Sequence, residues 1–364
     1  HEVAPVIGEF YERGDFPYEI VAGMGRMGLF GLPFAEEYGG MGGDYFALCL
    51  ALEELARVDS SVAITVEAGV SLGAMPIYRF GTPEQKQHWL PSLCAGERLG
   101  AFGLTEPGGG SDAGAVTTTA RLDGDEWVIN GTKSFITNAG TDITALVTVA
   151  AVTGVKPGGG KEISTIIVPA GTPGLAVSKK YSKVGWCASD TRELSFVDCR
   201  VPASNLLGDR GRGYAQFLSI LDEGRVAIAA VSVGLAQGCV DECVRYARER
   251  EAFGHKIGEY QAIQFKIADM EARAHTARLA YYHAAAAMLR GDPFKKEAAI
   301  AKLVASNAAM DNARDATQIF GGYGFMNETP VGRFYRDAKI LEIGEGTSEV
   351  QKMLISRHLG LVRQ

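Results

Sequence analysis

The spacing of hydrophobic and polar positions changes twice along the chain. Up to about residue 100, apolar residues recur at intervals of three and four, as in DYFALCLALEELARVDSSVAITVEAG, and this period predicts helices. One helix is expected to begin with Thr82 as N-cap and Pro83 at its first position. From about 101 to 212 the apolar runs are short and rich in β-branched residues, as in EWVINGTKSFIT and STIIVPA, and they predict strands.

Turn residues separate the predicted strands. Asp123-Gly124-Asp125 and the Gly158–Gly160 loop are typical of connections between strands. Asn130-Gly131 stands between two apolar-rich runs and predicts a tight hairpin, because this dipeptide adopts the backbone angles of a two-residue hairpin turn.

The helical period returns at about residue 213. Three long helices are predicted over 214–251, 259–291 and 293–322, and glycines follow the second and third of them. A short last helix is expected from Ser348, which forms a capping-box pattern with Gln351. The order helical, β, helical predicts an α+β protein with an N-terminal helical domain (1–100), a middle antiparallel β-barrel or sandwich domain (101–212) and a C-terminal four-helix bundle (213–364).

Composition and charge narrow the class of protein. The 364 residues carry a net charge of −7 and no dense Lys/Arg run, which argues against a nucleic-acid partner. No uninterrupted apolar stretch of membrane-spanning length and no signal peptide stand out. The six cysteines form no CxxC pair, so we expect them to be buried free thiols and not to bind a metal ion. Free thiols fit a protein of the reducing cytoplasm. The chain begins at His1 without Met, so we expect a short preceding piece, which for a mitochondrial matrix protein would include a transit peptide.

Two short motifs are better explained by structure than by chemistry. GMGRMG (23–28) matches the G-x-G-x-x-G of a dinucleotide-binding turn, with Asp44 about twenty residues on, but Pro33 and the glycines at 39–43 leave no room for the required helix. GVSLG (69–73) matches the nucleophile elbow of α/β-hydrolases. Its surroundings look like one helix, with no alternating strands and helices after it, so Ser71 is expected to pack within a helix.

Four other segments combine glycines with hydroxyl, amide or aromatic side chains. They are AFGLTEPGGGSDAG (101–114), FITNAG (135–140), QIFGGYGF (318–325) and EIGEGTSEV (342–350). Exposed backbone amides beside hydroxyls suit phosphate oxygens or the edge atoms of a flavin ring, although an ordinary glycine loop explains the segment 101–114 alone about as well.

Taken together, these segments resemble the signatures of the acyl-CoA dehydrogenase family, and the resemblance covers nearly the whole chain. GLTEPGGGSD resembles the first signature of that family, QIFGGYGFMNETPVGRFYRDAKI the second, and EGTSEVQ its catalytic loop. The resemblance implies the same helical, β, helical architecture. It also implies FAD bound between the β-domain and the C-terminal bundle, usually in a homotetramer whose neighbouring subunits share the cofactor site.

The resemblance assigns ligand contacts residue by residue. The implied FAD contacts are Phe102, Leu104, Thr105, Gly110, Ser111, Phe135, Ile136, Thr137, Thr347 and Glu349, together with Arg250, Phe253, Gln261, Gln318, Ile319, Gly321 and Gly322 reaching a neighbouring subunit's cofactor. The implied contacts to acyl-CoA are Ser111, Asp222, Arg225 and Gly346. For Arg225 and Arg250, a solvated helix charge would be the simpler interpretation without the shared spacing.

The implied reaction is α,β-dehydrogenation of an acyl-CoA thioester to its trans-2-enoyl product, with Glu345 as the base and FAD as the hydride acceptor. A glutamate buried against ring and acyl chain suits this role, because burial raises its pKa toward neutrality. The backbone amide of Glu345 and a flavin ribityl hydroxyl would polarise the thioester oxygen. The expected electron acceptor is an electron-transferring flavoprotein. Alternatives are an acyl-CoA oxidase-like or nitroalkane-oxidase-like enzyme that uses O₂, and a relative that keeps the fold as a binding protein.

Neighbouring residues sharpen the choice of base. Glu342 is expected to face solvent or pair with Lys339, and Glu349 to lie in the first turn of the last helix. Gly224, where some relatives carry the base on the long helix, offers no side chain as a substitute. Gly344 stands where several straight-chain relatives carry Tyr, which favours short or branched acyl groups without excluding medium chains.

Overall fold

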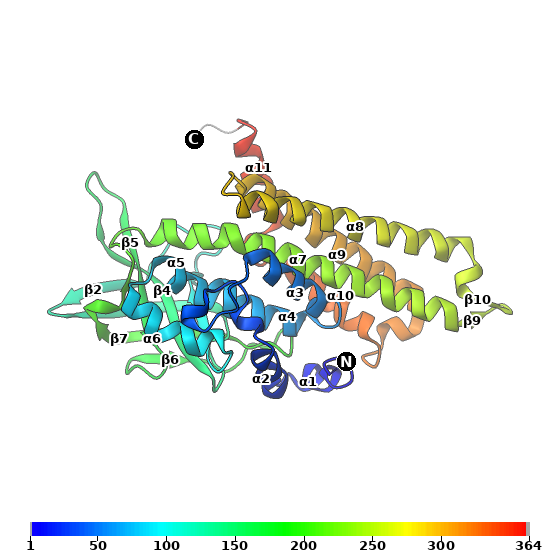
Figure 1. Ribbon diagram of the computed structural model, residues 1–364, viewed down its shortest axis with the longest axis horizontal. Coiled ribbons are helices and arrows are strands. Elements are labelled where there is room, and N and C mark those ends of the chain that lie inside the picture. The colour runs from blue at the N-terminus through cyan, green and yellow to red at the C-terminus, as the bar shows by residue number, and fades with distance from the viewer. Residues whose placement is uncertain (1, 362–364) are drawn as a thin grey trace.

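The computed structural model describes residues 2–361 and places a β-sheet at one end of an elongated molecule and the ends of long helices at the other (Figure 1). The N-terminal region is helical, as predicted. Its helices are α1 (Ile7–Arg13), α2 (Tyr18–Arg26), α3 (Tyr45–Ala56), α4 (Ser60–Glu67), α5 (Met75–Phe80) and α6 (Pro83–Cys94). The predicted start of α6 is confirmed, because the Thr82 side chain accepts from the backbone N–H of Gln85 and the Gln85 side chain accepts from that of Thr82.

The structure also shows which interpretation of the GMGRMG and GVSLG motifs is correct. Helix α2 runs through Gly23 and Gly25, so the GMGRMG segment is a helix end and not a strand-to-helix turn. Ser71 lies in a π-helical segment, Ala68–Ala74, that joins α4 to α5, and its Oγ accepts a hydrogen bond from Tyr45 at 2.9 Å. Neither the dinucleotide-binding nor the hydrolase interpretation has the geometry it needs.

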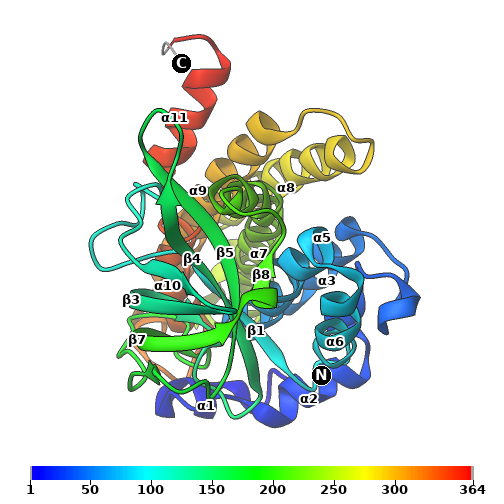
Figure 2. The same cartoon turned by 90° about the vertical axis from the view of Figure 1, so that its left-hand side faces the viewer.

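The middle region forms one eight-stranded sheet. Its strands are β1 (Leu99–Gly103), β2 (Thr119–Asp123), β3 (Glu126–Thr137), β4 (Thr144–Val155), β5 (Lys161–Pro169), β6 (Leu175–Val177), β7 (Thr191–Pro202) and β8 (Leu206–Leu207). The strand order is β6-β7-β3-β2-β4-β5-β8, with β1 also beside β4. Most neighbours are antiparallel, as predicted, but β1 and β2 pair with β4 in parallel, so the sheet is mixed. Figure 2 views this sheet end.

The hairpin prediction at Asn130-Gly131 is wrong. Strand β3 continues through both residues, and its register against β7 shifts beside Gly131, as in a β-bulge. A Cβ atom at Gly131, whose φ is 149°, would lie 2.5 Å from Thr118 Oγ1. The glycine therefore permits close approach of a neighbouring segment. The turn between β2 and β3 is instead at Gly124, where φ is 64°.

The C-terminal region is built on α7 (Gly213–Glu249), α8 (Gln261–Leu289) and α9 (Lys295–Phe320), which run side by side (Figure 1). The two-residue strands β9 (Glu251–Ala252) and β10 (His255–Lys256) link α7 to α8. The fourth bundle helix is α10 (Pro330–Leu341), which the sequence analysis did not predict, and α11 (Ser348–His358) projects from the bundle (Figure 2). The capping prediction for α11 is off by one residue, because Thr347 is the N-cap and its hydroxyl accepts from Val350 N at 3.3 Å.

Helix α7 is the centre of the largest hydrophobic core, which joins the N-terminal helices to the bundle. Two helical segments, 60–80 and α7, are long and apolar enough by composition to cross a membrane, yet 94% and 89% of their apolar windows are buried inside the protein. Burial of this kind is what core helices show, so their composition carries no membrane assignment.

Candidate functional site

The connection between α10 and α11 holds Glu345 in an unusual backbone conformation. Its φ is 53°, in the left-handed region that side chains disfavour, and the φ of Gly346 is 95°. Six residues that are not glycine have a positive φ in the described part of the chain. Three of them are predicted site residues, namely Phe135, Phe253 and Glu345. Because such strain persists only where the surroundings impose it, these positions are candidates for function.

Glycine in the long helix makes room for the Glu345 side chain. A Cβ atom on Gly224 would lie 2.3 Å from Glu345 Oε2, so any larger residue there would displace the carboxyl group. Oε2 is buried and has no hydrogen-bond partner among the described residues. The carboxyl group therefore faces α7 with one oxygen free for a ligand.

The surroundings of Glu345 bring its pKa to about 7. Burial raises the pKa, while the adjacent Glu67 carboxyl group and the positive charges of Arg225 and Lys302 lower it. A carboxyl group with a pKa near the operating pH suits proton abstraction. A large fraction of such groups is ionised, and the carboxylate is a stronger base than one with an ordinary pKa.

Glu67 is the second carboxyl group at this place. It is the last residue of α4 and is fully buried, and neither of its carboxyl oxygens has a hydrogen-bond partner among the described residues. Burial and the neighbouring Glu345 carboxylate both raise its pKa well above the usual range. Glu67 is therefore the group of the pair that holds a proton at neutral pH.

The predicted CoA-binding pair lies beside Glu345. Arg225 directly follows Gly224, is 5% exposed and forms an ion pair with Asp222, one turn earlier in α7. Lys295 Nζ reaches the other Asp222 oxygen at 3.1 Å. The interpretation of Arg225 as a solvated helix charge is therefore wrong, because a buried guanidinium needs partners.

A buried ion pair anchors the first glycine-rich segment. Lys133 Nζ lies 2.7 Å from Glu106 Oε1, and both side chains are almost fully buried. Burial alone would raise the pKa of Glu106, but hydrogen bonds from Lys133, Thr117 and Thr118 lower it to about 2. The following residues, among them Gly110 and Ser111, are exposed. The anchor thus fixes the start of a loop whose tip is open to a ligand.

The segment around Phe135 links the sheet to the helix that carries Glu67. The Phe135 side chain is 65% exposed at a register shift of β3, whereas Ile136 points into the core. Asn138 donates to Thr65 O of α4 at 3.1 Å. Thr137 and its neighbours are therefore tied to the helix that ends at Glu67.

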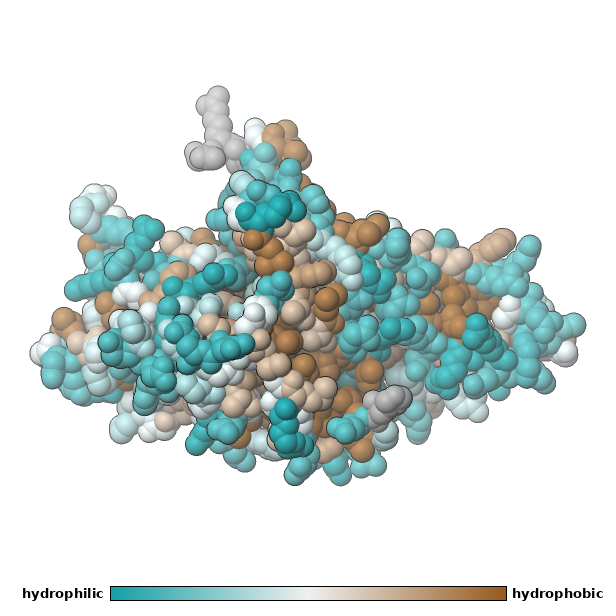
Figure 3. Space-filling view, in the orientation of Figure 1, coloured by the Kyte–Doolittle hydropathy of each residue, from teal (hydrophilic) through white to brown (hydrophobic). Residues whose placement is uncertain are grey.

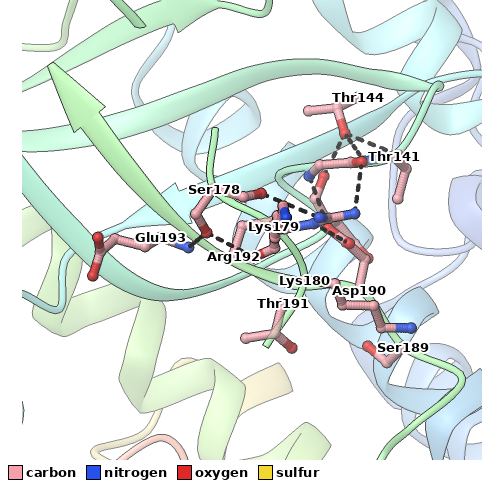
Figure 4. Close-up of polar contacts among 12 residues, drawn as sticks. Thr141, Thr144, Ser178, Lys179, Lys180, Ser189, Asp190, Thr191, Arg192 and Glu193 are labelled. Atoms are coloured by element: carbon pink, nitrogen blue, oxygen red, sulfur yellow. Dashed lines mark hydrogen bonds and ion pairs between the residues drawn. The ribbon is translucent and has the colours of Figure 1, made fainter. Parts of the chain in front are cut away.

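Figure 4 shows how the chain after Asn138 is held. Arg192 Nε lies 2.6 Å from Asp190 Oδ1, and its Nη atoms donate to Ser178 O at 3.1 Å and Gly140 O at 3.3 Å. The other Asp190 oxygen accepts from Gly140 N at 2.8 Å. This network fixes the end of the Phe135–Thr137 segment from the side of β7.

The remaining predicted cofactor residues lie at the opposite end of the bundle, around β9 and β10 (Figure 1). Arg250 follows α7, and its guanidinium stands 5.7 Å from the Tyr323 ring centroid. Phe253 is 95% exposed, and a Cβ on Gly321 or Gly322 would meet no heavy atom within 4 Å. Gln261 and Gln318 are exposed.

Within one chain, the predicted FAD contacts therefore lie in two separate groups. The group on the sheet and at the start of α11 offers hydroxyls, amides and an exposed aromatic ring, and the group at the far end offers an arginine and open glycine backbone. Both sets fit parts of FAD, a ring system and a diphosphate with adenosine, respectively. The side chains of Leu104, Ile136 and Ile319 are buried, so these residues can meet the cofactor only through their backbone.

Sequence reasoning missed three residues of this site. They are Glu67, and Lys302 and Gln351, which both donate to the carbonyl oxygen of Gly346. A single Glu in the apolar run AITVEAGV was the available signal for Glu67. The six cysteines are free thiols, and no cluster of three or more His, Cys, Asp or Glu residues within 2–361 could hold a metal ion. Glu342 pairs with Lys339 at 2.7 Å, as predicted, and Glu349 is exposed in the first turn of α11.

The sequence matches all three domain descriptions of one enzyme family. These are "Acyl-CoA dehydrogenase, N-terminal domain" over residues 1–97, "middle domain" over 101–199 and "C-terminal domain" over 211–360. A probable acyl-CoA dehydrogenase of Bacillus subtilis is 50% identical over 98% of this chain and 94% of its own length.

Two solved structures are similar over nearly their whole length. The butyryl-CoA dehydrogenase of Megasphaera elsdenii has a TM-score of 0.94 at 43% identity, covering 98% of this chain and 94% of that one. A chain solved in work on the electron transferring flavoprotein of Acidaminococcus fermentans has a TM-score of 0.94 at 45% identity, covering 99% and 94%. Because every domain and nearly every residue are matched at these identities, the chain belongs to the acyl-CoA dehydrogenase family of FAD-dependent oxidoreductases.

Proposed function

We propose that this acyl-CoA dehydrogenase converts short or branched acyl-CoA thioesters to trans-2-enoyl-CoA, with Glu345 as the base. The observation that carries the proposal is the Glu345 carboxyl group. It lies in the space that Gly224 leaves open, with one buried oxygen unpartnered and a pKa of about 7. Among the described residues, the glutamates that flank it make other contacts or face solvent.

The residues of the site divide the work of the reaction. Glu345 Oε2 takes the α-proton of the thioester, and its backbone N–H donates to the thioester oxygen as negative charge develops there. Arg225 and Asp222 bind the CoA portion, and Ser111 contacts both ligands. FAD, when bound, accepts the hydride from the β-carbon. Thr105, Phe135–Thr137, Thr347 and Glu349 hold the ring end of the cofactor.

The reaction class is tested with a panel of straight, branched and aromatic acyl-CoAs under exclusion of air. Bleaching of the flavin by one or more thioesters, with the enoyl product identified by mass, supports the proposal. A yellow protein that none of the panel reduces contradicts it.

The acyl preference rests on Gly344. A Cβ at this position would meet only Ile340, at ordinary contact distances of 3.4 Å and above, so there is room for a side chain that would narrow the pocket wall. The similar enzyme from Megasphaera elsdenii is named for butyryl-CoA, a short substrate. The proposed substrates include medium-chain acyl-CoA thioesters as well.

Gly344→Tyr is expected to lower the ratio of branched to straight substrate turnover by about tenfold, because a ring beside the base crowds a branch near the reacting carbons. The ratio of kcat/KM for isobutyryl-CoA and butyryl-CoA measures this change. An unchanged ratio in a folded, yellow variant contradicts the pocket assignment.

We propose an electron-transferring flavoprotein as the acceptor, supported by the similarity to a chain solved with that system. An oxidase-like enzyme would instead pass electrons to O₂. Peroxide formation measured against reduction of added electron-transferring flavoprotein separates the two, and stoichiometric peroxide in air would favour the oxidase.

We also propose a homo-oligomer, with four chains as the family resemblance implies, and the two separated groups of predicted FAD contacts support it. A second copy would bring its Arg250 and Gly321 to the cofactor held by Thr105 and Phe135. Light scattering is expected to show the oligomer, and Arg250→Ala to weaken FAD binding without changing the fold. A monomer that holds FAD tightly contradicts this arrangement.

A further inference from the structure

Two buried donors from different helices hold the connection that carries Glu345. Lys302 Nζ, from α9, donates to Gly346 O at 2.8 Å, and Gln351 Nε2, from α11, donates to the same oxygen at 2.8 Å. The Gln351 amide also reaches Glu345 O at 3.4 Å. Lys302 and Gln351 are both fully buried. A carbonyl oxygen has two lone pairs, so the pair of donors fills the capacity of Gly346.

Glycine at position 346 is part of this clamp. A Cβ there would lie 2.8 Å from Gln351 Nε2, and residues with side chains rarely adopt a φ of 95°. Glu345 precedes it in the left-handed region, a conformation that persists only where neighbours hold it. The clamp supplies that restraint directly beside the base.

The charge of Lys302 has no simple structural explanation. Its hydrogen bond goes to a neutral carbonyl, and within residues 2–361 no carboxylate lies at ion-pair distance from its ammonium. Burial lowers the pKa of Lys302 to about 8, and the Glu345 carboxylate is the strongest influence in the opposite direction. A neutral donor would satisfy the carbonyl at a smaller desolvation cost, so the ammonium is expected to act through its charge.

The titratable groups that face Glu345 come from three helices. Glu67 of α4 is held protonated by its surroundings, whereas Arg225 of α7 and Lys302 of α9 are positive. Lys302 is also influenced by Arg225 and, more weakly, by Glu342 and Glu349 on either side of the connection. Arg225 is already neutralised by Asp222, which leaves Lys302 as the cation without a closer counter-charge.

We infer that Lys302 is a positioning residue for the proposed reaction: its ammonium fixes the Gly346 carbonyl, and with it the turn at Glu345, and its charge favours the carboxylate form of the base. Gln351 shares the first role and not the second. This inference rests on the proposed function of Glu345 as the base.

Three variants of the holoenzyme separate the two roles. Lys302→Met removes the donor and the charge, Lys302→Arg keeps the charge, and Gln351→Met removes a donor without changing charge. Both methionine variants are expected to speed amide hydrogen exchange at residues 344–348. Only Lys302→Met is expected to move the midpoint of the pH profile of flavin reduction, upward by about one unit, because the base loses a nearby cation.

At pH 7 the Lys302→Met variant should therefore reduce its flavin about fivefold more slowly because of the shifted midpoint, and this part of the loss should be recovered at pH 9. Lys302→Arg should keep the original midpoint. Lys296→Met removes a partly exposed lysine of the same helix and is expected to change neither the midpoint nor the exchange. If Lys302→Met does not fold, Lys302→Gln, which keeps a polar group without charge, takes its place.

A folded Lys302→Met or Lys302→Gln variant with an unmoved midpoint and unchanged exchange overturns the inference. The proposed function fails separately, if Glu345→Gln reduces its flavin at the original rate. An inactive Glu345→Gln together with an unmoved midpoint and unchanged exchange in the lysine variants would remove the role of Lys302 and leave the base in place.

Discussion

Glu345→Gln is expected to keep FAD and acyl-CoA bound while the rate of flavin reduction falls by at least about 10³-fold. The substitution keeps the size of the side chain and removes the proton acceptor. Among the described residues near this position, Gly224 has no side chain that could act as the base instead. Glu67 is held protonated by burial and by the neighbouring residue 345. Stopped-flow bleaching of the flavin by excess acyl-CoA, without air, measures the rate directly.

The matched controls are the two neighbouring glutamates. Glu342→Gln is expected to be near neutral, because it removes only a half-exposed pair with Lys339. Glu349→Gln should act mainly through FAD affinity. Flavin reduction at the original rate in Glu345→Gln, with loss in either control, would mean that another carboxylate is the base.

The pH dependence of the unaltered enzyme follows from the same group. Only the carboxylate form of Glu345 accepts the α-proton, so the rate of flavin reduction is expected to rise with pH through about 7 and to level off above it. Glu345→Gln should remove this rise along with the rate.

Gly224→Ala is the second variant expected to have a large effect. The added methyl group would lie 2.3 Å from Glu345 Oε2, so the carboxyl group must move, and a displacement of about 1 Å at the reacting atoms costs roughly 10²-fold in rate. Alanine is also the better helix former by about 1 kcal/mol, so thermal stability should not fall through helix propensity. The expected result is a folded, yellow protein that reduces its flavin slowly.

Gly23→Ala in α2 is the matched control, because a Cβ there meets only the flexible end of Arg26 at 3.6 Å. It makes the same chemical change in a helix away from Glu345 and should leave the rate unchanged. Equal rates for Gly224→Ala and the unaltered enzyme would show that the carboxyl group does not need the space beside α7.

Local signals in the sequence were most reliable where local interactions decide the structure. Thr82-Pro83 predicted the start of α6, because capping satisfies backbone groups within one turn. Asn130-Gly131 failed, since the contacts of Gly131 with Thr118 in a neighbouring segment outweighed its turn preference. Helix α10 was missed although Pro330 stands at its first position, a signal that was available within the second signature.

The centre of the site was predictable only in part. The glycines around Glu345 and the family signatures point to the proposed base and to the proposed ligand contacts. Glu67, Lys302 and Gln351 belong to α4, α9 and α11, and nothing in their local sequence places them together. Their roles depend on charges and carbonyls that tertiary packing brings close, which no periodicity encodes.

The separation of the two groups of predicted FAD contacts by the 37-residue helix α7 has a genetic consequence. At about 1.5 Å per residue this helix is about 55 Å long, so a cofactor at one end would complete its binding site with another chain. If so, a variant damaged at Arg250 and one damaged at Thr105 would each be inactive alone. In a mixed assembly, half of the sites formed between unlike chains would combine the two intact halves, so co-expression would restore activity through intersubunit complementation.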